Sequence, residues 1–293
     1  MEDPIDFYKN HGLLSSPGDY LYILEQTPED LNGICDIMHN ITAIDFLVNL
    51  GVFNIPKKHK SDVNIKSAAN KLKALANRNA NNKNTNGVFK NKLFGNCRDI
   101  SLLLCASLRH KGIPSRIRSG FATFFAPIKK FDHWVCEYWD ETSNDWKRID
   151  LWMHQVQKHL DKIPAEFGAG MAQIDINPLN VGKSFFLTGG EAWSICRNNS
   201  DDPKNYGTYE PGLEGLWFIR DNMIRDLFCL NKIEMQAWDC WGIMGRENAV
   251  NPEKDNNLLD KVARDTTEQR ISLETINTLC NQLGKKGFPD KWI

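Results

Sequence analysis

The sequence predicts an α+β fold, in which helices and a small antiparallel sheet occupy separate stretches of the chain. Residues 100–108 form an almost unbroken apolar run, which is typical of a buried helix. Segments that alternate in polarity follow and read as strands: 115–125, 133–139 and 146–152. Polar residues at 140–145 indicate a hairpin between the last two strands. Helical spacing of apolar residues returns at 216–230 and 273–283.

Composition and charge exclude some classes of function. The 293 residues are 41% hydrophobic and 25% charged, which is ordinary for a globular protein with a sizeable core. Lys and Arg number 36 against 37 Asp and Glu, giving a formal net charge of -1. A chain without a strong positive field is not expected to recruit nucleic acid or an anionic membrane. We therefore expect neither as a partner.

The sequence also favours a cytoplasmic location. No apolar stretch approaches the roughly 20 residues that a membrane-spanning helix needs. The N-terminal stretch 1–6 is acidic, unlike an export signal. The eight cysteines are scattered through mostly apolar segments and lack the dense spacing of a secreted disulfide framework. We interpret them as reduced thiols.

We divide the chain into three segments that form one globular unit: an N-terminal helical segment at 1–86, a catalytic core at 87–160 and a C-terminal extension at 161–293. In the first segment, apolar spacing predicts one helix from Thr27, its N-cap, to Gly51. A second helix is expected at 63–76. Residues 20–24 read as extended, and the Asn- and Lys-rich stretch 77–86 reads as a loop.

Cys97 is the strongest candidate for a reactive residue. It lies where the apolar helix begins, so unpaired backbone amides and the positive end of the helix dipole favour its thiolate. The same amides can bind the oxyanion that forms when a thiolate attacks a carbonyl group. Gly95, two residues earlier, leaves room for a substrate backbone.

The predicted hairpin supplies partners for this thiol. A four-residue loop at 140–143 would pair Val135 with Arg148 and place His133 directly opposite Asp150. Asp150 would then hold one imidazole nitrogen and leave the other for Cys97 as general base and acid. The alternative interpretation is a structural hydrogen bond between His133 and Asp150 on a sheet face.

Four sequence patterns carry a family resemblance: G-N-C-R-D at 95–99, G-I-P-S-R-I-R-S-G-F at 112–121, D-H-W-V-C-E-Y at 132–138 and R-I-D at 148–150. Together they resemble the transglutaminase-like superfamily, in particular its bacterial transglutaminase-like domain proteins. The resemblance implies a papain-like core, with a buried helix that begins at the cysteine and packs on an antiparallel sheet. It also implies a catalytic triad of Cys97, His133 and Asp150.

Further similarity extends into the C-terminal segment, at 185–193, 215–227 and 238–242. Animal cross-linking enzymes have a tryptophan after the nucleophile, whereas this chain has Arg98. The aspartate is followed here by Leu151. These departures leave the triad intact and concern glutamine specificity and calcium activation, so the resemblance alone implies neither.

These observations predict a cysteine-dependent enzyme that transfers an acyl group from a glutamine or peptide amide through a thioester, on a protein or peptide substrate. The chemistry needs no cofactor. One alternative is a peptidase, amidase or deamidase that uses the same triad with water as the acceptor. The other is a non-catalytic module that binds peptide or protein. The sequence leaves the oligomeric state open.

Side chains near the triad in sequence or in the later motifs are candidates for substrate contacts: Asn96, Arg98, Asp99, Trp134, Glu191 and Trp193. We expect Cys105 and Cys136 to be core residues, because each lies in an apolar segment. His154 and His159 lack a clustered pair of further ligands, so no metal site is predicted.

Overall fold

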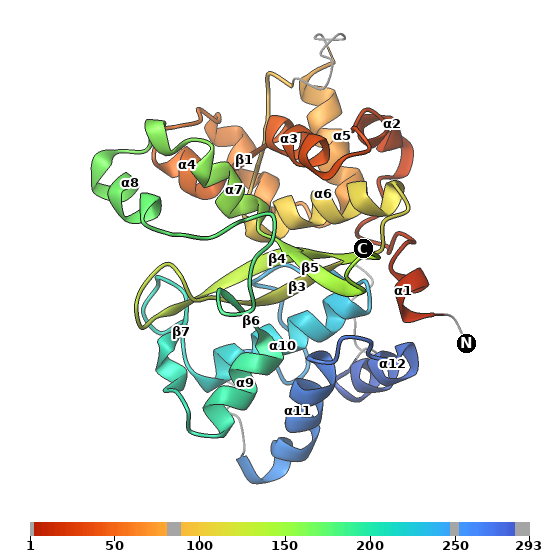
Figure 1. Cartoon of the computed structure of the whole chain (residues 1–293), viewed down its shortest axis with the longest axis vertical. Coiled ribbons are helices and arrows are strands. Elements are labelled where there is room, and N and C mark those ends of the chain that lie inside the picture. Colours follow the sequence, from red (N-terminus) through yellow and green to blue (C-terminus); the bar gives the residue numbers. More distant parts are fainter. Residues whose placement is uncertain (1–2, 81–88, 247–251, 285–293) are drawn as a thin grey trace.

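The computed structural model describes residues 3–80, 89–246 and 252–284, with side chains from residue 257 onward in the last range. A curled sheet lies between two groups of helices (Figure 1). The helices of the upper group in Figure 1 are α2 (Leu21–Glu25), α3 (Leu31–Ile41), α4 (Asp45–Asn49), α5 (Ala68–Arg78), α6 (Cys97–His110), α7 (Leu151–Gln157) and α8 (Ala165–Ala172). Those of the lower group are α9 (Gly189–Arg197), α10 (Leu216–Leu230), α11 (Pro252–Thr266) and α12 (Leu273–Gln282). The short α1 (Pro4–Phe7) lies beside the sheet.

The central sheet has the strand order β5-β4-β3-β6, with every pair antiparallel. Its strands are β3 (Ser115–Ala122), β4 (Lys130–Asp140), β5 (Asp145–Ile149) and β6 (Phe186–Thr188), and β7 (Tyr206–Gly207) pairs in parallel with the start of β4. A separate parallel pair joins β1 (Thr42–Ile44) and β2 (Leu93–Gly95). The predicted α+β fold is therefore confirmed.

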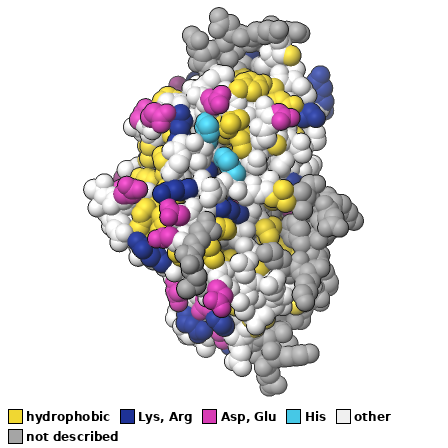
Figure 2. Space-filling view, turned by 90° about the vertical axis from the view of Figure 1, so that its right-hand side faces the viewer, with side chains coloured by type: hydrophobic (Ala, Val, Ile, Leu, Met, Phe, Trp, Pro, Cys, Tyr) yellow, Lys and Arg dark blue, Asp and Glu magenta, His cyan; other side chains and the backbone are white. Residues whose placement is uncertain are grey.

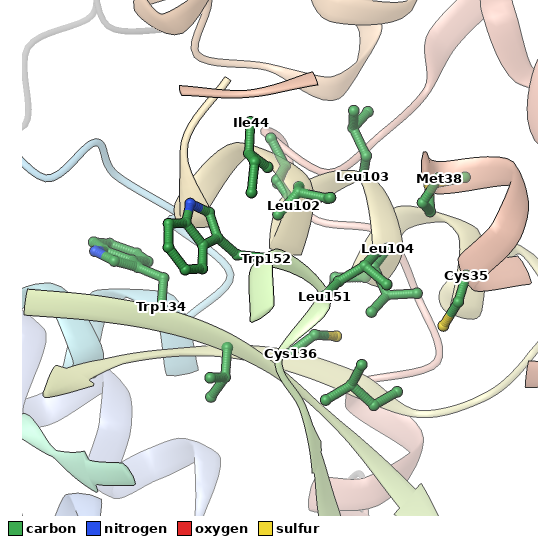
Figure 3. Packing of buried hydrophobic residues seen from close by; sticks show 14 of the residues in the cluster. Cys35, Met38, Ile44, Leu102, Leu103, Leu104, Trp134, Cys136, Leu151 and Trp152 are labelled. Carbon is green, nitrogen blue, oxygen red and sulfur yellow. The ribbon is translucent and has the colours of Figure 1, made fainter. Parts of the chain in front are cut away.

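Two hydrophobic clusters hold the helices on the sheet. Helix α6 packs on β4 and is buried along almost its whole length, as the sequence predicted. Figure 3 shows labelled side chains from α3, α6, α7 and β4 converging in this cluster. Helix α10 packs on β3 and belongs to the second cluster, which includes α9, α11 and α12. The sheet is thus covered on both faces.

The helix predicted from Thr27 to Gly51 is interrupted. Asp30, rather than Thr27, caps α3 by accepting a hydrogen bond from the Gly33 amide. The chain then extends into β1, where the Gln155 side chain bonds both the Ile44 amide and the Thr42 carbonyl. Residues distant in sequence therefore override the helical periodicity.

Other boundaries also differ from the predictions. Residues 21–25 are helical rather than extended, and β5 ends at Ile149, so Trp152 belongs to α7. Helix α11 was not predicted, whereas α10 and α12 lie where the sequence indicated. The predicted 63–76 helix begins later, at Ala68. Most of the predicted 77–86 loop lies outside the described residues.

The surface agrees with the balanced composition. Acidic and basic side chains are interspersed on the face that Figure 2 shows. Among the described residues, no helix combines the length and the apolar character needed to cross a bilayer.

Gly189 permits the close approach of α9 and α10. A Cβ atom at this position would lie 2.4 Å from the Met223 Cα atom and 2.5 Å from its backbone nitrogen. Backbone atoms of a packed helix cannot move aside cheaply. The two helices can therefore reach this separation only with glycine here.

We predict that Gly189→Ala lowers the free energy of unfolding by about 1–3 kcal/mol, because the added methyl group overpacks this contact. Gly170→Ala in α8 is the matched control, since nothing lies within 4 Å of a Cβ atom there. Urea unfolding of both variants checks the prediction. Equal stability of the two variants would contradict it.

Candidate active site

Cys97 is the first residue of α6. Asn96 caps this helix, its side chain accepting a hydrogen bond from the Asp99 amide at 3.1 Å, and Asp99 accepts one from the Asn96 amide in return. This capping box fixes the first turn. The amides of Cys97 and Arg98 have no acceptor within the helix, because they precede its first i→i−4 bond. They are therefore available to stabilise the oxyanion that forms on a carbonyl oxygen when the Cys97 sulfur attacks the carbonyl carbon.

His133 and Asp150 form a buried pair. The Nε2 atom of His133, on β4, lies 2.8 Å from Oδ2 of Asp150. The other carboxylate oxygen of Asp150 accepts a hydrogen bond from the Met153 amide and caps α7. The Asp150 amide donates to the Pro178 carbonyl at 2.7 Å. With Nε2 engaged, Nδ1 is the imidazole nitrogen left for proton exchange.

The contact between His133 and Asp150 does not arise from the predicted strand register. Glu137 pairs with Arg148, two positions from the predicted pairing, because the hairpin loop is 141–144 rather than 140–143. His133 lies opposite Gly120 of β3. Asp150 lies just beyond the end of β5, and it reaches the imidazole from the start of α7.

Backbone contacts place Cys97 beside the strand that carries His133. The backbone amide of Trp134 lowers the pKa of the Cys97 thiol, which places it near the sulfur. One turn along α6, the Ser101 hydroxyl donates to the Trp134 carbonyl at 3.3 Å. The start of α6 is therefore fixed against the residue that follows His133. The structure pairs His133 with Asp150 and fixes the start of α6, where Cys97 lies, against the adjacent Trp134. Their joint use as a catalytic triad stays a prediction.

The environment of Cys97 does not favour its thiolate. Although the residue is partly exposed, burial of its thiol raises its pKa, and the nearby carboxyl groups of Asp132 and Asp45 raise it further. The Trp134 amide opposes this shift. Burial and the two carboxyl groups therefore outweigh the amides and the dipole at the start of α6, which the sequence analysis expected to favour the thiolate. Because Cys97 is then a neutral thiol at pH 7, it needs a base to become nucleophilic.

Sequence reasoning missed the two carboxyl groups beside the thiol. Asp132 accepts a hydrogen bond from the Asn222 amide group at 2.6 Å, and Asp45 accepts one from the Trp152 indole at 3.2 Å. Burial raises the pKa of both carboxyl groups. Asp45 comes from α4, far from Cys97 in sequence, so no local pattern indicated it. Asp132 is next to His133 and could have been considered.

Aromatic side chains surround the imidazole. The rings of Phe125 and Trp152 each meet the His133 ring edge-on, with centroids 5.7 Å apart. Nearby, Tyr209 stacks on Phe131 with centroids 4.4 Å apart, while 75% of its surface stays exposed. This apolar surrounding restricts the access of water to the base.

Of the predicted substrate contacts, Arg98 and Asp99 have partners within the fold, and Trp134 is buried. The Arg98 guanidinium is 1% exposed and donates to the backbone carbonyls of Glu234 and Met235. Asp99 pairs with the buried Lys71 at 3.0 Å. The Trp134 side chain is also buried, with 1% of its surface exposed.

The remaining candidates are also engaged in the fold. Glu191 forms a capping box with Thr188 at the start of α9. Trp193 is 1% exposed and donates to Asp260 at 2.7 Å. Asn96 is the helix cap beside Cys97. In the part of the chain that the structure describes, no three His, Cys, Asp or Glu side chains are grouped to hold a metal ion. Cys105 and Cys136 are buried, as predicted.

Comparison with known proteins agrees with this geometry. Residues 60–151 match the family model of the transglutaminase-like superfamily. This match supports the resemblance that the sequence motifs indicated. The transglutaminase-like segment runs from the turn before α5 to the first residue of α7, and it contains Cys97, His133 and Asp150. A search of curated proteins found no match to the chain.

We predict that Asp132→Asn increases the alkylation rate of Cys97 by iodoacetamide about fivefold at pH 7.5. Loss of a neighbouring negative charge lowers the pKa of the Cys97 thiol. Because pH 7.5 is below that pKa, a lower pKa increases the fraction of thiolate. Peptide mapping by mass spectrometry measures the rate at Cys97, with the exposed Cys240 as internal reference.

The matched control is Glu141→Gln, which removes one negative charge from the exposed hairpin loop. It should leave the rate at Cys97 unchanged. An Asp132→Asn protein with the rate of the Glu141→Gln control would contradict this electrostatic account.

Proposed function

We propose that this protein is a thiol acyltransferase that attacks amide substrates through Cys97. The observation that carries the proposal is the buried 2.8 Å contact between His133 Nε2 and Asp150, formed beside a cysteine at a helix start. The match of residues 60–151 to the transglutaminase-like superfamily supports an enzymatic role for this segment. The proposed substrate is a protein or peptide with an accessible glutamine side chain or peptide amide.

In the first half-reaction, Nδ1 of His133 accepts the thiol proton as the Cys97 sulfur forms a bond to the amide carbon. The backbone amides of Cys97 and Arg98 stabilise the resulting oxyanion. The carbon–nitrogen bond then breaks, and the leaving nitrogen takes the proton from His133 and departs as ammonia or an amine. A thioester on Cys97 remains.

The second half-reaction reverses these roles. His133 accepts a proton from the incoming amine or water, whose nitrogen or oxygen bonds to the thioester carbon. The carbon–sulfur bond breaks, and the sulfur recovers its proton from the imidazolium. An amine acceptor gives transamidation, and water gives hydrolysis. The apolar rings around His133 favour amine as the acceptor, because they limit the supply of water.

Asp150 orients the base. Its carboxylate accepts a hydrogen bond from the Nε2–H group, which selects the tautomer with a free Nδ1, and it stabilises the imidazolium that forms transiently within each half-reaction. In this role, Asp150 acts only through His133.

Casein and a fluorescent primary amine, dansylcadaverine, test the proposal. We expect ammonia release together with covalent incorporation of the amine, and Cys97→Ala should abolish both. Cys240→Ala is the matched control and should retain them, since Cys240 is an exposed cysteine that belongs to none of the triad elements. Ammonia release without incorporation would identify water as the acceptor. Absence of any Cys97-dependent release of ammonia, amine or cleaved peptide would contradict the proposal.

We predict that Asp150→Asn lowers kcat by about 100-fold or more while the protein stays folded. An asparagine can still cap α7, but it cannot stabilise the imidazolium as a carboxylate does. Steady-state kinetics and thermal unfolding check the two parts separately. Asp150→Ala, which also loses the cap, should be less stable by about 1 kcal/mol. Unchanged kcat in Asp150→Asn would remove Asp150 from the mechanism.

A further inference from the structure

A pocket of about 300 Å³ lies along β5 and the hairpin end of the sheet. It shares no lining residue with the candidate triad. Five cationic side chains line it: Arg116, Arg118, Lys147, Arg148 and Lys183. Among the described residues, two acidic side chains, Glu137 and Asp145, line the same space. The pocket therefore carries an excess of positive charge.

Most of this charge is buried around one carboxylate. Glu137 accepts hydrogen bonds from Arg116 at 2.7 Å, from Arg148 at 2.8 Å and from Arg118 at 3.3 Å. These three cations hold the pKa of Glu137 well below its usual range, so it remains charged. Arg118 has a second partner in Asp226, at 2.7 Å.

The buried charges do not balance. Three guanidinium groups face the two carboxyl groups of Glu137 and Asp226, and all five side chains are at least nine-tenths buried. An uncompensated buried charge is costly, and an anion in the adjoining pocket would offset it.

Donor groups also remain available at the pocket. Arg148 uses Nε on Glu137 and Nη1 on the Phe186 carbonyl, which leaves its Nη2 without an acceptor among the described residues. Gly182, an exposed residue without a side chain, lets a ligand approach the backbone. Thr267 and Gln269 add neutral polar groups.

We propose that this pocket binds a small phosphate-bearing molecule. Guanidinium groups present paired N–H donors that match phosphate oxygens, and the lysines add point charges at the rim. The volume is at the lower end of the range for small-molecule sites, which suits a phosphate group with a small organic part. The pocket is close to the candidate active site in sequence, because its lining residue Arg148 is two residues from Asp150. The backbone carbonyl of Arg148 also accepts a hydrogen bond from the amide of Val181, another lining residue.

Calorimetric titration of the full chain with inorganic phosphate and with pyrophosphate tests the proposal. Chloride keeps the ionic strength constant, and acetate is the monoanionic comparison. We expect saturable binding of phosphate, tighter binding of pyrophosphate and no measurable binding of acetate. Cys97→Ala should bind phosphate as the wild type does, so this result is independent of the proposed acyl transfer.

The Lys147→Gln/Lys183→Gln double variant should raise the phosphate Kd about tenfold, because two nearby charges are lost while the buried arginines stay in place. The matched control is Lys57→Gln/Lys58→Gln, which removes the same charge from exposed residues elsewhere. This control should bind as the wild type does. Lack of saturable phosphate binding, or the same Kd in the double variant and its control, would overturn the proposal.

Discussion

Asp150 divides its carboxylate between two donors, and the geometry of the candidate site depends on this division. One oxygen caps α7, and the other holds His133 at 2.8 Å. The helix start therefore fixes the carboxylate, and the carboxylate fixes the imidazole. A side chain with two directional bonds has little freedom to rotate, which is what a positioning residue for a general base requires.

The second constraint is electrostatic. Carboxyl groups of Asp45, Asp132 and Asp150 surround the thiol and, together with burial, keep Cys97 protonated in the resting protein. A protonated thiol is protected from adventitious oxidation and alkylation, because the thiolate is the reactive form. In the proposed mechanism, reaction then depends on His133 receiving the proton as substrate arrives. The same field that lowers the intrinsic reactivity of the thiol therefore ties its activation to the imidazole.

The sequence predicted those parts of the fold that local patterns determine. The apolar residues of α6 and the amphipathic spacing of α10 identified two helices that organise the two cores. The interrupted helix at 27–51 was not predictable in this way, because Gln155 bonds the backbone of β1 from more than 100 residues away. Helix α11 carries spaced apolar residues such as Leu259 and Val262, so a signal for it was present.

The same distinction between local patterns and distant contacts applies to the candidate site. The order and motifs of His133 and Asp150 indicated that they would meet, and they do, although the expected register was wrong. The roles of the neighbouring polar residues depended on distant partners. Arg98 is held by carbonyls at 234 and 235, and Trp193 by Asp260, and no pattern near either residue indicates these contacts.

The most direct test of the account is to trap the acyl-enzyme. The protein would be mixed with p-nitrophenyl acetate, quenched in acid and mapped by mass spectrometry. We predict that the acetyl group appears on Cys97 before the exposed Cys240, and that His133→Asn slows acetylation of Cys97 by about 100-fold. Faster acetylation of Cys240, or acetylation of Cys97 at the same rate without the imidazole, would contradict the assignment of Cys97 and His133 as nucleophile and base.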